Sequence, residues 1–385
     1  MPVFLETRFT GPMNKEVIIS RLFEFGGSNS HLKTLIKYFG KDQVILLLEE
    51  EDQLKYLDKI TDHEPVQTAV MPGMHPYAHL AHSSILSNLK ETFRLIRSAA
   101  RLLIFCLRNK VGGVTINTID PEKYLYFFWI PFLRVRYIVH STPQPRFTYF
   151  TSYTCNKRLG KRKGIITVSN ANHVLIVKEW HVKHDKEAFV TVIYNCVTEN
   201  ARNNDSPADE KGIKIMTMGH MVPYKNPDMW IEVAKTLTGR FKDVSFTWAG
   251  DGPLMNALKM KACNNERISL PGVTDDTSAY LTDSVIYYQP SLHETHGIAV
   301  LEAMYYALPC VVSDAGGLPE SILDGFNGFV VKASSLEAHV EALSLLIENP
   351  GLRQEYGRRS RARYLDTFSF DIFKTKMDAL YANNQ

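Results

Sequence analysis

Short runs of β-branched and apolar residues alternate with longer stretches of helical periodicity along almost the whole chain, and this alternation restricts the possible folds most strongly. Regular alternation of strands and helices favours open, parallel sheets with helices packed on them. The candidate strands of the first half are Glu16–Ser20, Gln43–Leu48, Val66–Val70, Gly113–Asn117, Arg136–His140, Gly164–Val168 and Phe189–Ile193. Those of the second half are Lys214–Met218, Val244–Ala249, Ile268–Leu270, Ser284–Gln289, Pro309–Ser313 and Gly328–Val331. So many strands exceed one sheet of this kind, and the sequence therefore predicts an α/β chain with two doubly wound domains.

A polar segment divides the chain near its middle. Residues Thr198–Gly212 read TENARNNDSPADEKG, carry Pro and Gly and show no apolar period, which is typical of a linker. We therefore predict one Rossmann-like domain over residues 1–200 and a second over residues 201–367. The sequence also predicts a helix from about Ser334 to Tyr364 and another that starts near Asp371. Ligands bind beyond the carboxyl ends of the strands in such sheets, so we expect a ligand in a cleft where the two domains face each other.

Composition excludes several other classes of protein. Of the 385 residues, 45% are hydrophobic and 22% are charged, which is typical of a globular chain and not of a disordered or fibrous one. The five cysteines are odd in number and widely spaced, which favours a reducing, cytoplasmic compartment. The N-terminus lacks the apolar segment of a signal peptide. The longest apolar run, Tyr124–Leu133, has ten residues, fewer than the ~20 that span a bilayer, so we expect a soluble protein or one that binds the inner face of a membrane peripherally.

Positive charge is concentrated in one part of the first half. Residues 90–163 carry 15 basic and three acidic side chains. The segment Glu91–Lys110 interleaves arginines with Leu, Ile and Phe, which fits either an interfacial helix on anionic lipid or a core helix with a basic face. An acidic partner or a solvated basic face would each explain this charge. Neither an RNA-binding sheet motif nor a zinc finger is present, so we expect no nucleic-acid partner.

The segment that carries most of the chemistry reads YYQPSLHETHGIAVLEAMYYALP. A buried strand ends at Pro290, a loop carries Glu294, and Gly297 opens a helix that runs to about Ala307. The free N–H groups of such a helix start form an anion site. Glu302 and Glu294 flank this site, so one can accept from a ribose diol and the other from a sugar hydroxyl. Taken alone, the same two residues also fit a surface carboxylate and a helix cap.

The wider pattern resembles the family-4 glycosyltransferases, which have the GT-B fold. Their hallmark is a Glu-x7-Glu pair in a Pro-Ser-x-x-Glu-Gly-Phe-Gly frame that ends in Glu-Ala-Met. This chain departs from that frame at Thr295 and His296, where Gly-Phe is usual, and this bears on the pocket around the transferred sugar. The matching residues are Pro290, Ser291, Glu294, Gly297, Glu302, Ala303, Met304, Leu308, Pro309, Gly316, Gly317, Pro319, Glu320, Asp324, Gly325, Asn327 and Gly328.

Further matches carry the resemblance into the rest of the chain. By position, Gly219 and Lys225 correspond to diphosphate contacts, while His220 stands where the family has Arg, a stronger phosphate partner. Val273 follows a strand at the place of the nucleotide-base contact. In the first half the resemblance is looser. There Gly26–Gly27 resembles the glycine loop that approaches the donor phosphate, and His140 corresponds to a histidine that projects toward the reacting sugar.

The resemblance implies an activity. Such enzymes transfer a sugar from a nucleoside diphosphate sugar with retention at the anomeric carbon, through a front-face reaction. It implies that Glu294 and His140 serve the reacting sugar, and that Glu302 binds ribose. The donor-binding set would be Gly26, Gly27, Gly219, His220, Lys225, Val273, Thr295, His296, Gly297, Ile298 and Glu302.

The resemblance also bears on architecture and partners. The helix at 368–385 would cross back to the first domain, as in GT-B relatives. Neither a metal ion nor a cofactor is expected, since no Asp-x-Asp and no His/Cys cluster of ligand spacing occurs. The expected partners are a UDP- or GDP-linked sugar, a glycan or lipid-linked acceptor of surface polysaccharide or glycolipid synthesis, and an anionic membrane surface. A catalytically silent nucleotide-sugar-binding subunit, a nucleotide-sugar epimerase and a phosphorylase are the alternatives.

Overall fold

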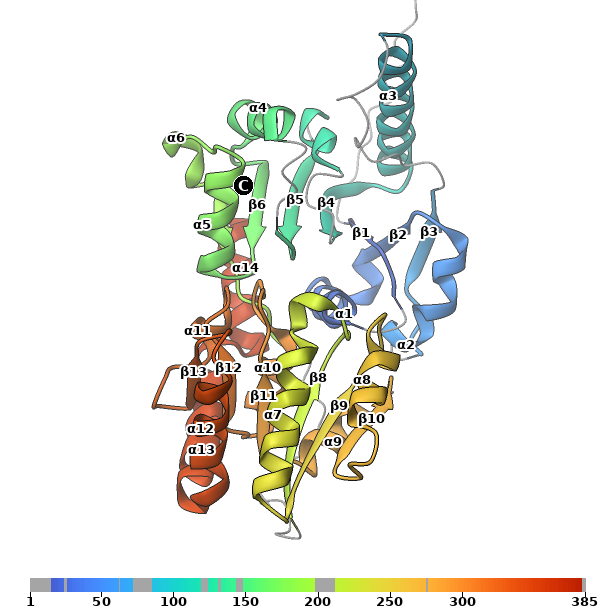
Figure 1. The fold of residues 1–385 in the computed structure, drawn as a ribbon. Coiled ribbons are helices and arrows are strands. Elements are labelled where there is room, and N and C mark those ends of the chain that lie inside the picture. The colour runs from blue at the N-terminus through green and yellow to red at the C-terminus, as the bar shows by residue number, and fades with distance from the viewer. Residues whose placement is uncertain are drawn as a thin grey trace, which may run out of the picture.

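The computed structural model describes residues 15–23, 26–61, 63–71, 85–118, 124–130, 133–142, 148–197, 212–274 and 276–382. Within them the chain forms two sheets with helices packed against each (Figure 1). One has seven strands in the order β3-β2-β1-β4-β5-β6-β7, and the other has six in the order β10-β9-β8-β11-β12-β13. Neighbouring strands are parallel throughout both sheets. The predicted α/β class with two doubly wound sheets is confirmed.

The strands begin and end within two residues of their predicted bounds. The first sheet contains β1 Lys15–Ser20, β2 Val44–Leu48, β3 Gln67–Val70, β4 Val111–Thr118, β5 Arg134–Val139, β6 Lys163–Thr167 and β7 Val190–Val192. The second contains β8 Ile213–Met218, β9 Val244–Ala249, β10 Ile268–Gly272, β11 Ile286–Gln289, β12 Cys310–Ser313 and β13 Gly328–Val331. Almost all of the linker that we predicted, residues 198–211, lies outside the described residues.

Helices connect most of the strands. Those that accompany the first sheet in sequence are α1 Gly27–Phe39, α2 Leu57–Thr61, α3 Ile85–Arg108, α4 Thr148–Arg158, α5 Asn170–Glu179 and α6 His184–Glu187. Those that follow are α7 Pro227–Arg240, α8 Met255–Ala262, α9 Thr277–Thr282, α10 Ile298–Tyr305, α11 Leu318–Ser321, α12 Leu336–Glu348, α13 Pro350–Thr367 and α14 Phe370–Ala382. No helix in the described ranges combines the length and the apolar character needed to cross a bilayer.

The chain is helical over the predicted range from about Ser334 to Tyr364, but it forms two helices there. α12 ends at Glu348, and α13 begins at Pro350. Proline has no N–H to donate and clashes with the preceding turn, so it starts a new helix rather than continuing the old one.

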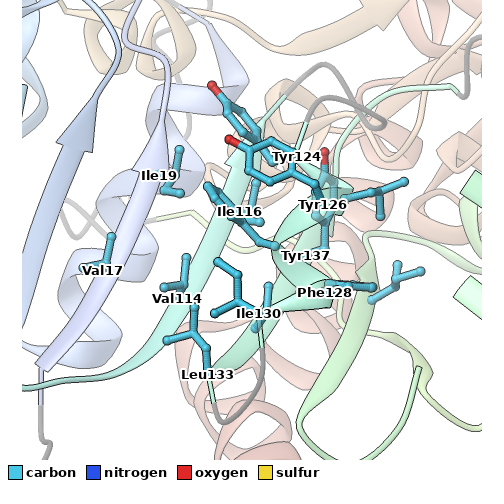
Figure 2. Packing of buried hydrophobic residues seen from close by; sticks show 14 of the residues in the cluster. Val17, Ile19, Val114, Ile116, Tyr124, Tyr126, Phe128, Ile130, Leu133 and Tyr137 are labelled. Carbon is cyan, nitrogen blue, oxygen red and sulfur yellow. The ribbon is translucent and has the colours of Figure 1, made fainter. Parts of the chain in front are cut away.

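Most of the described residues of the apolar run Tyr124–Leu133 belong to the core of the first sheet. Its 3-10 helix, Leu125–Trp129, buries Phe127 and Phe128 almost completely. Figure 2 shows the side chains of this run against Val114 and Ile116 of β4 and other strand residues. The run is therefore a core element.

The helix α14 packs on the first sheet although it follows the second sheet in sequence. Phe373 and Met377 are buried in a cluster that includes Leu32 and Leu35 of α1 and Ile18 of β1. Figure 1 shows the red end of the chain running up beside the first sheet. The last helix therefore completes the first core.

A buried carboxylate ties the same helix to the amino ends of the strands. Glu16 accepts hydrogen bonds from Thr115 Oγ1 at 2.7 Å, Arg134 at 2.9 Å and the Tyr381 hydroxyl at 3.3 Å. Burial is the main cause that raises the pKa of Glu16, and the Arg134 guanidinium opposes it. Gly113 leaves room for this group, because a Cβ there would lie 2.3 Å from Glu16 Oε2.

The packing of α14 predicts a selective loss of stability. We expect Phe373→Ala to lower the free energy of unfolding by about 3–5 kcal/mol, because it opens a cavity in the first core. Hydrogen exchange followed by mass spectrometry should show faster exchange in β1 and α1 than in β8 and β9. The control is Leu365→Ala on α13, whose side chain is exposed. Equal acceleration in both sheets would contradict the prediction.

Candidate functional site

The candidate site lies where segments that follow strands of the two sheets meet. In the first sheet these segments begin after β1, β5 and β6, and in the second they begin after β8 and β11. Hydrogen bonds join them: the Thr295 hydroxyl donates to the His140 carbonyl at 2.7 Å, and the Ser169 hydroxyl donates to the Thr295 carbonyl. The carboxyl ends of both sheets therefore contribute to one region, as expected for a ligand site of this fold class.

Two glycines after β1 approach the second sheet closely. A Cβ on Gly26 would lie 3.1 Å from His220 Nε2, and one on Gly27 would lie 3.3 Å from Ile298 Cδ1. Gly26 also has φ 128°, a conformation that other residues rarely adopt. These glycines bring the backbone at the start of α1 against residues of the second sheet.

The helix α10 begins without a side-chain cap. Its N-cap residue, Gly297, has the left-handed φ of 86°, and a Cβ there would lie 2.8 Å from Leu318 Cδ2. Glycine is therefore required both by conformation and by space. The uncapped first-turn amides, beginning at Ile298, supply donors for an anion.

Glu294 lies in the loop between β11 and α10 and is largely buried. Its Oε1 accepts from Lys225 Nζ, from Gln289 Nε2 at 2.5 Å and from the Ser291 hydroxyl at 3.5 Å. Lys225 and Glu294 thus form an ion pair whose side chains are 16% and 10% exposed. The pair places one cation and one carboxylate next to the uncapped helix start.

The remaining candidate residues of the second sheet follow β8 and β10. Gly219 has φ 133°, and a Cβ there would lie 3.9 Å from Lys225 Cε. His220 comes next and lies against Gly26. Val273 follows β10 and is half-buried. β10 is the outermost strand of its sheet, two positions from β8. The structure thus brings His220 and Lys225 to the site, while Val273 lies at the carboxyl end of a more distant strand of the same sheet.

Glu302 lies on α10 beyond its first turn. Burial raises its pKa to about 7, so the side chain titrates near neutral pH. Burial is also the main cause that raises the pKa of the Tyr287 phenol, and both Glu302 and Glu294 add to that increase. The two carboxylates therefore both lie near one buried tyrosine.

His140 follows β5 and is neutral at pH 7, because burial lowers its pKa to about 4. Its Nε2 lies 2.6 Å from Asn117 Oδ1, and the Asn117 amide nitrogen donates to Ser20 Oγ at 3.1 Å. Since the amide oxygen can only accept, Nε2 carries the proton, and Nδ1 is the acceptor of the ring. The ring of His31 contacts it edge-on, with centroids 4.4 Å apart.

Thr295 and His296 connect the two sheets through contacts that Gly-Phe could not make. Thr295 donates its hydroxyl proton to the His140 carbonyl. His296 is fully buried, accepts from Asn195 N at 3.3 Å through Nδ1, and stacks on Tyr194 with centroids 5.0 Å apart. Burial lowers the pKa of His296 to about 3, so its ring is neutral. Its predicted contact with a donor stays a prediction.

Several residues of this region were absent from the sequence-based set. They are Ser20, Asn117, Ser169, Asn195 and Gln289, together with Glu320, which accepts from Asn170 N and Ala171 N at the start of α5. Of these, Ser20, Asn117 and Gln289 left a signal as polar residues at the ends of predicted apolar strands, and Glu320 belongs to the family pattern. The others show their role only through contacts that are distant in sequence.

Comparison with solved structures identifies the architecture as the GT-B fold of glycosyltransferases. The structure of HepE from Anabaena in complex with UDP and glucose has a TM-score of 0.75 at 15% identity, and the match covers 96% of this chain and 99% of that one. A glycosyltransferase from Rickettsia africae has a TM-score of 0.74 at 18% identity, with 96% and 99% covered.

The second half of the chain also matches a sequence family. Residues 199–363 match the family described as Glycosyl transferases group 1. The UDP-Gal:alpha-D-GlcNAc-diphosphoundecaprenol alpha-1,3-galactosyltransferase of Escherichia coli is 31% identical over 195 residues, 46% of this chain and 50% of the relative. The chain spans about half the length of the curated relatives it matches.

The raised pKa of Glu302 predicts pH-dependent stability. Between its ordinary value of 4.5 and about 7, the folded chain keeps a proton that the unfolded chain has released, so the free energy of unfolding falls as pH rises through this window. We expect Glu302→Gln to be more stable than the wild type at pH 8 by about 1–2 kcal/mol, since the side chain is only half-buried, and little different at pH 5.

Urea denaturation at the two pH values measures this difference. The matched control is Glu341→Gln, which removes an exposed carboxylate on α12 and should give no pH-dependent gain. A gain of equal size at pH 5 and pH 8 would show that Glu302 is already ionised in the folded chain throughout this range.

Proposed function

We propose that this protein is a retaining, metal-independent glycosyltransferase that moves a sugar from a UDP- or GDP-linked donor to a glycan or lipid-linked acceptor. The observation that carries the proposal is the convergence of Lys225, Glu294 and the uncapped start of α10 at the meeting point of two parallel sheets. The match of residues 199–363 to group 1 glycosyl transferases and the GT-B fold support it.

The donor diphosphate would occupy the start of α10. Lys225 supplies the cation, and the first-turn amides after Gly297 supply donors that need no reorganisation. Gly26 and Gly27 let the backbone of the first sheet approach the same place. His220 adds a ring nitrogen there, in place of the bidentate guanidinium of an arginine.

The sugars of the donor would be held by acceptors. Glu294 receives a hydroxyl of the transferred sugar, and Glu302, once ionised, receives the ribose hydroxyls. His140 is neutral and has Nδ1 as its acceptor, so it binds a sugar hydroxyl rather than a phosphate. These groups orient the donor, while Lys225 and the helix amides stabilise the departing charge.

The proposed reaction breaks the bond between the anomeric carbon and the diphosphate oxygen. The acceptor oxygen forms the new bond on the same face, and its proton passes to the leaving phosphate oxygen. Retention follows from this same-face attack. Neither a metal ion nor a cofactor enters the proposed reaction.

The acceptor is proposed from relatives. The Escherichia coli relative is named for a diphosphoundecaprenol acceptor, and a Staphylococcus aureus relative is named as a poly(ribitol-phosphate) alpha-N-acetylglucosaminyltransferase. By analogy we place this protein in surface polysaccharide or glycolipid synthesis.

A panel of nucleotide sugars tests the proposed function. Wild type and Glu302→Ala are heated with UDP-glucose, GDP-mannose or ADP-glucose, since a ligand that binds only the folded chain raises its melting temperature. We expect one donor to raise the melting temperature of the wild type by several degrees and to leave that of Glu302→Ala unchanged. Release of the free nucleoside diphosphate with an added acceptor extract then separates an enzyme from a silent binding subunit. If no donor stabilises the wild type, the proposal is wrong.

We further propose that α3 binds an anionic membrane surface. Leu102 and Cys106 face the core, while Phe93, Ile96 and Ile104 on the opposite side are 68%, 62% and 50% exposed. Arg97, Arg101 and Arg108 are also exposed. Exposed apolar side chains beside arginines are typical of a helix that lies in the headgroup region. Figure 1 shows α3 extending away from the second sheet.

Vesicle flotation tests the surface of α3. We expect the protein to float with vesicles that contain phosphatidylglycerol and to stay behind with pure phosphatidylcholine, because the arginines need anionic lipid. Ile96→Asp should lower the bound fraction severalfold. Met260→Asp, which charges an equally exposed apolar residue on α8, is the control and should float like the wild type. Equal flotation of all three proteins would contradict the proposal.

A further inference from the structure

Gln289 is a buried polar residue at the end of an apolar strand. It is the last residue of β11, follows Ile286, Tyr287 and Tyr288, and is 2% exposed. A buried amide costs stability unless its hydrogen bonds are made. Its partners therefore indicate what the residue does.

Hydrogen bonds from the strand fix the orientation of the Gln289 amide. Met218 N donates to the Tyr287 hydroxyl oxygen at 3.3 Å, and that hydroxyl donates its own proton to Gln289 Oε1 at 3.0 Å. Burial raises the pKa of Tyr287 well above its ordinary value, so the phenol keeps its proton. The amide oxygen must therefore face Tyr287.

The amide nitrogen consequently faces Glu294. Gln289 Nε2 donates to Glu294 Oε1 at 2.5 Å. The opposite orientation would set the amide oxygen against the carboxylate, which is repulsive, and would leave the phenol proton without its acceptor. The hydrogen bonds from Met218 through Tyr287 and Gln289 to Glu294 therefore all donate in this one direction.

The side chains that donate hydrogen bonds to Glu294 all donate to the same carboxylate oxygen. Gln289, Lys225 and Ser291 each donate to Oε1, and within the described residues Oε2 has no hydrogen-bond partner. Lys225 is an ammonium on a flexible stem that a diphosphate would attract, whereas Gln289 is held by a strand. When Lys225 turns to a phosphate, Gln289 still holds Oε1.

We infer that Gln289 is a positioning residue that holds Glu294 by Oε1 and thereby presents Oε2 to a hydroxyl of the transferred sugar. This inference rests on the proposed function. It assigns to Gln289 a share of the affinity for the sugar and none of the affinity for the nucleoside diphosphate. It also explains why the strand ends in a buried amide.

Calorimetric titration with matched ligands tests the inference. The probes are UDP-glucose against UDP, and GDP-mannose against GDP, so that each pair differs only by the sugar. Gln289→Met keeps the length of the side chain and removes its donor. We expect it to weaken binding of the sugar nucleotide about tenfold and to leave binding of the diphosphate within about twofold, since the lost bond is to a carboxylate.

A double-mutant cycle shows whether Gln289 acts through Glu294. In a Glu294→Ala background, Gln289→Met should cause no further loss of sugar-nucleotide affinity. Tyr287→Phe, which removes only the group that orients the amide, should give a smaller loss in the same direction. The control is Thr217→Val, which removes buried hydrogen bonds to the Tyr288 carbonyl and from the Trp230 indole without touching Glu294 and should alter stability only.

The outcomes separate the inference from the proposed function. If the wild type binds neither pair, the proposed function fails, and the role of Gln289 fails with it. If the wild type prefers the sugar nucleotide and Gln289→Met keeps that preference, only the inference is wrong. Equal losses for sugar nucleotide and diphosphate, or additive losses with Glu294→Ala, would show a general structural role and would also overturn it.

Discussion

Strand direction is the constraint on which the rest of this structure depends. Every strand in a sheet runs the same way, so the segments after β1, β4 and β5 reach one edge, and those after β8 and β11 reach the corresponding edge of the other sheet. Hydrogen bonds between Thr295, His140 and Ser169 join the two edges. Residues that are far apart in sequence thereby come within contact, as Gly27 and Ile298 do. A change of direction in one central strand would move its terminal residues to the far side of the sheet.

Burying a charged side chain between the sheets costs free energy, and the ionisable residues there reflect this cost. His31, His140 and His296 are buried and neutral because burial lowers the pKa of each ring. Glu294 forms an ion pair with Lys225, whereas Glu302 forms no ion pair within the described residues, and burial raises its pKa to about 7. Lys225 places a positive charge beside the uncapped start of α10. An anion that enters there meets Lys225, whose charge Glu294 balances. It also meets the first-turn amides of α10, which have no side-chain cap.

Much of the fold and part of the site could be predicted from the sequence. The apolar runs located all the strands to within two residues, since hydrophobic burial and β-propensity act locally. The break at Pro350 was missed although proline marks it, because the apolar period continues on both sides. Glu294 and Lys225 could be selected by motif, but their ion pair could not, since it spans 69 positions. The direction of the Gln289 amide depends on a phenol and a backbone N–H of another strand, and no local pattern contains that information.

The place of α14 has a consequence for how the chain is made. Ribosomes release a protein from its first residue onward, and domains usually fold as they emerge. Here the core beneath β1 and α1 lacks Phe373 and Met377 until nearly 350 further residues have appeared. The second sheet, by contrast, has its apolar clusters complete once Phe368, the residue after α13, has been synthesised. The second half can thus complete its core before the first half does. Until α14 is added, the first half exposes apolar surface, and we expect chaperones to bind the nascent chain there.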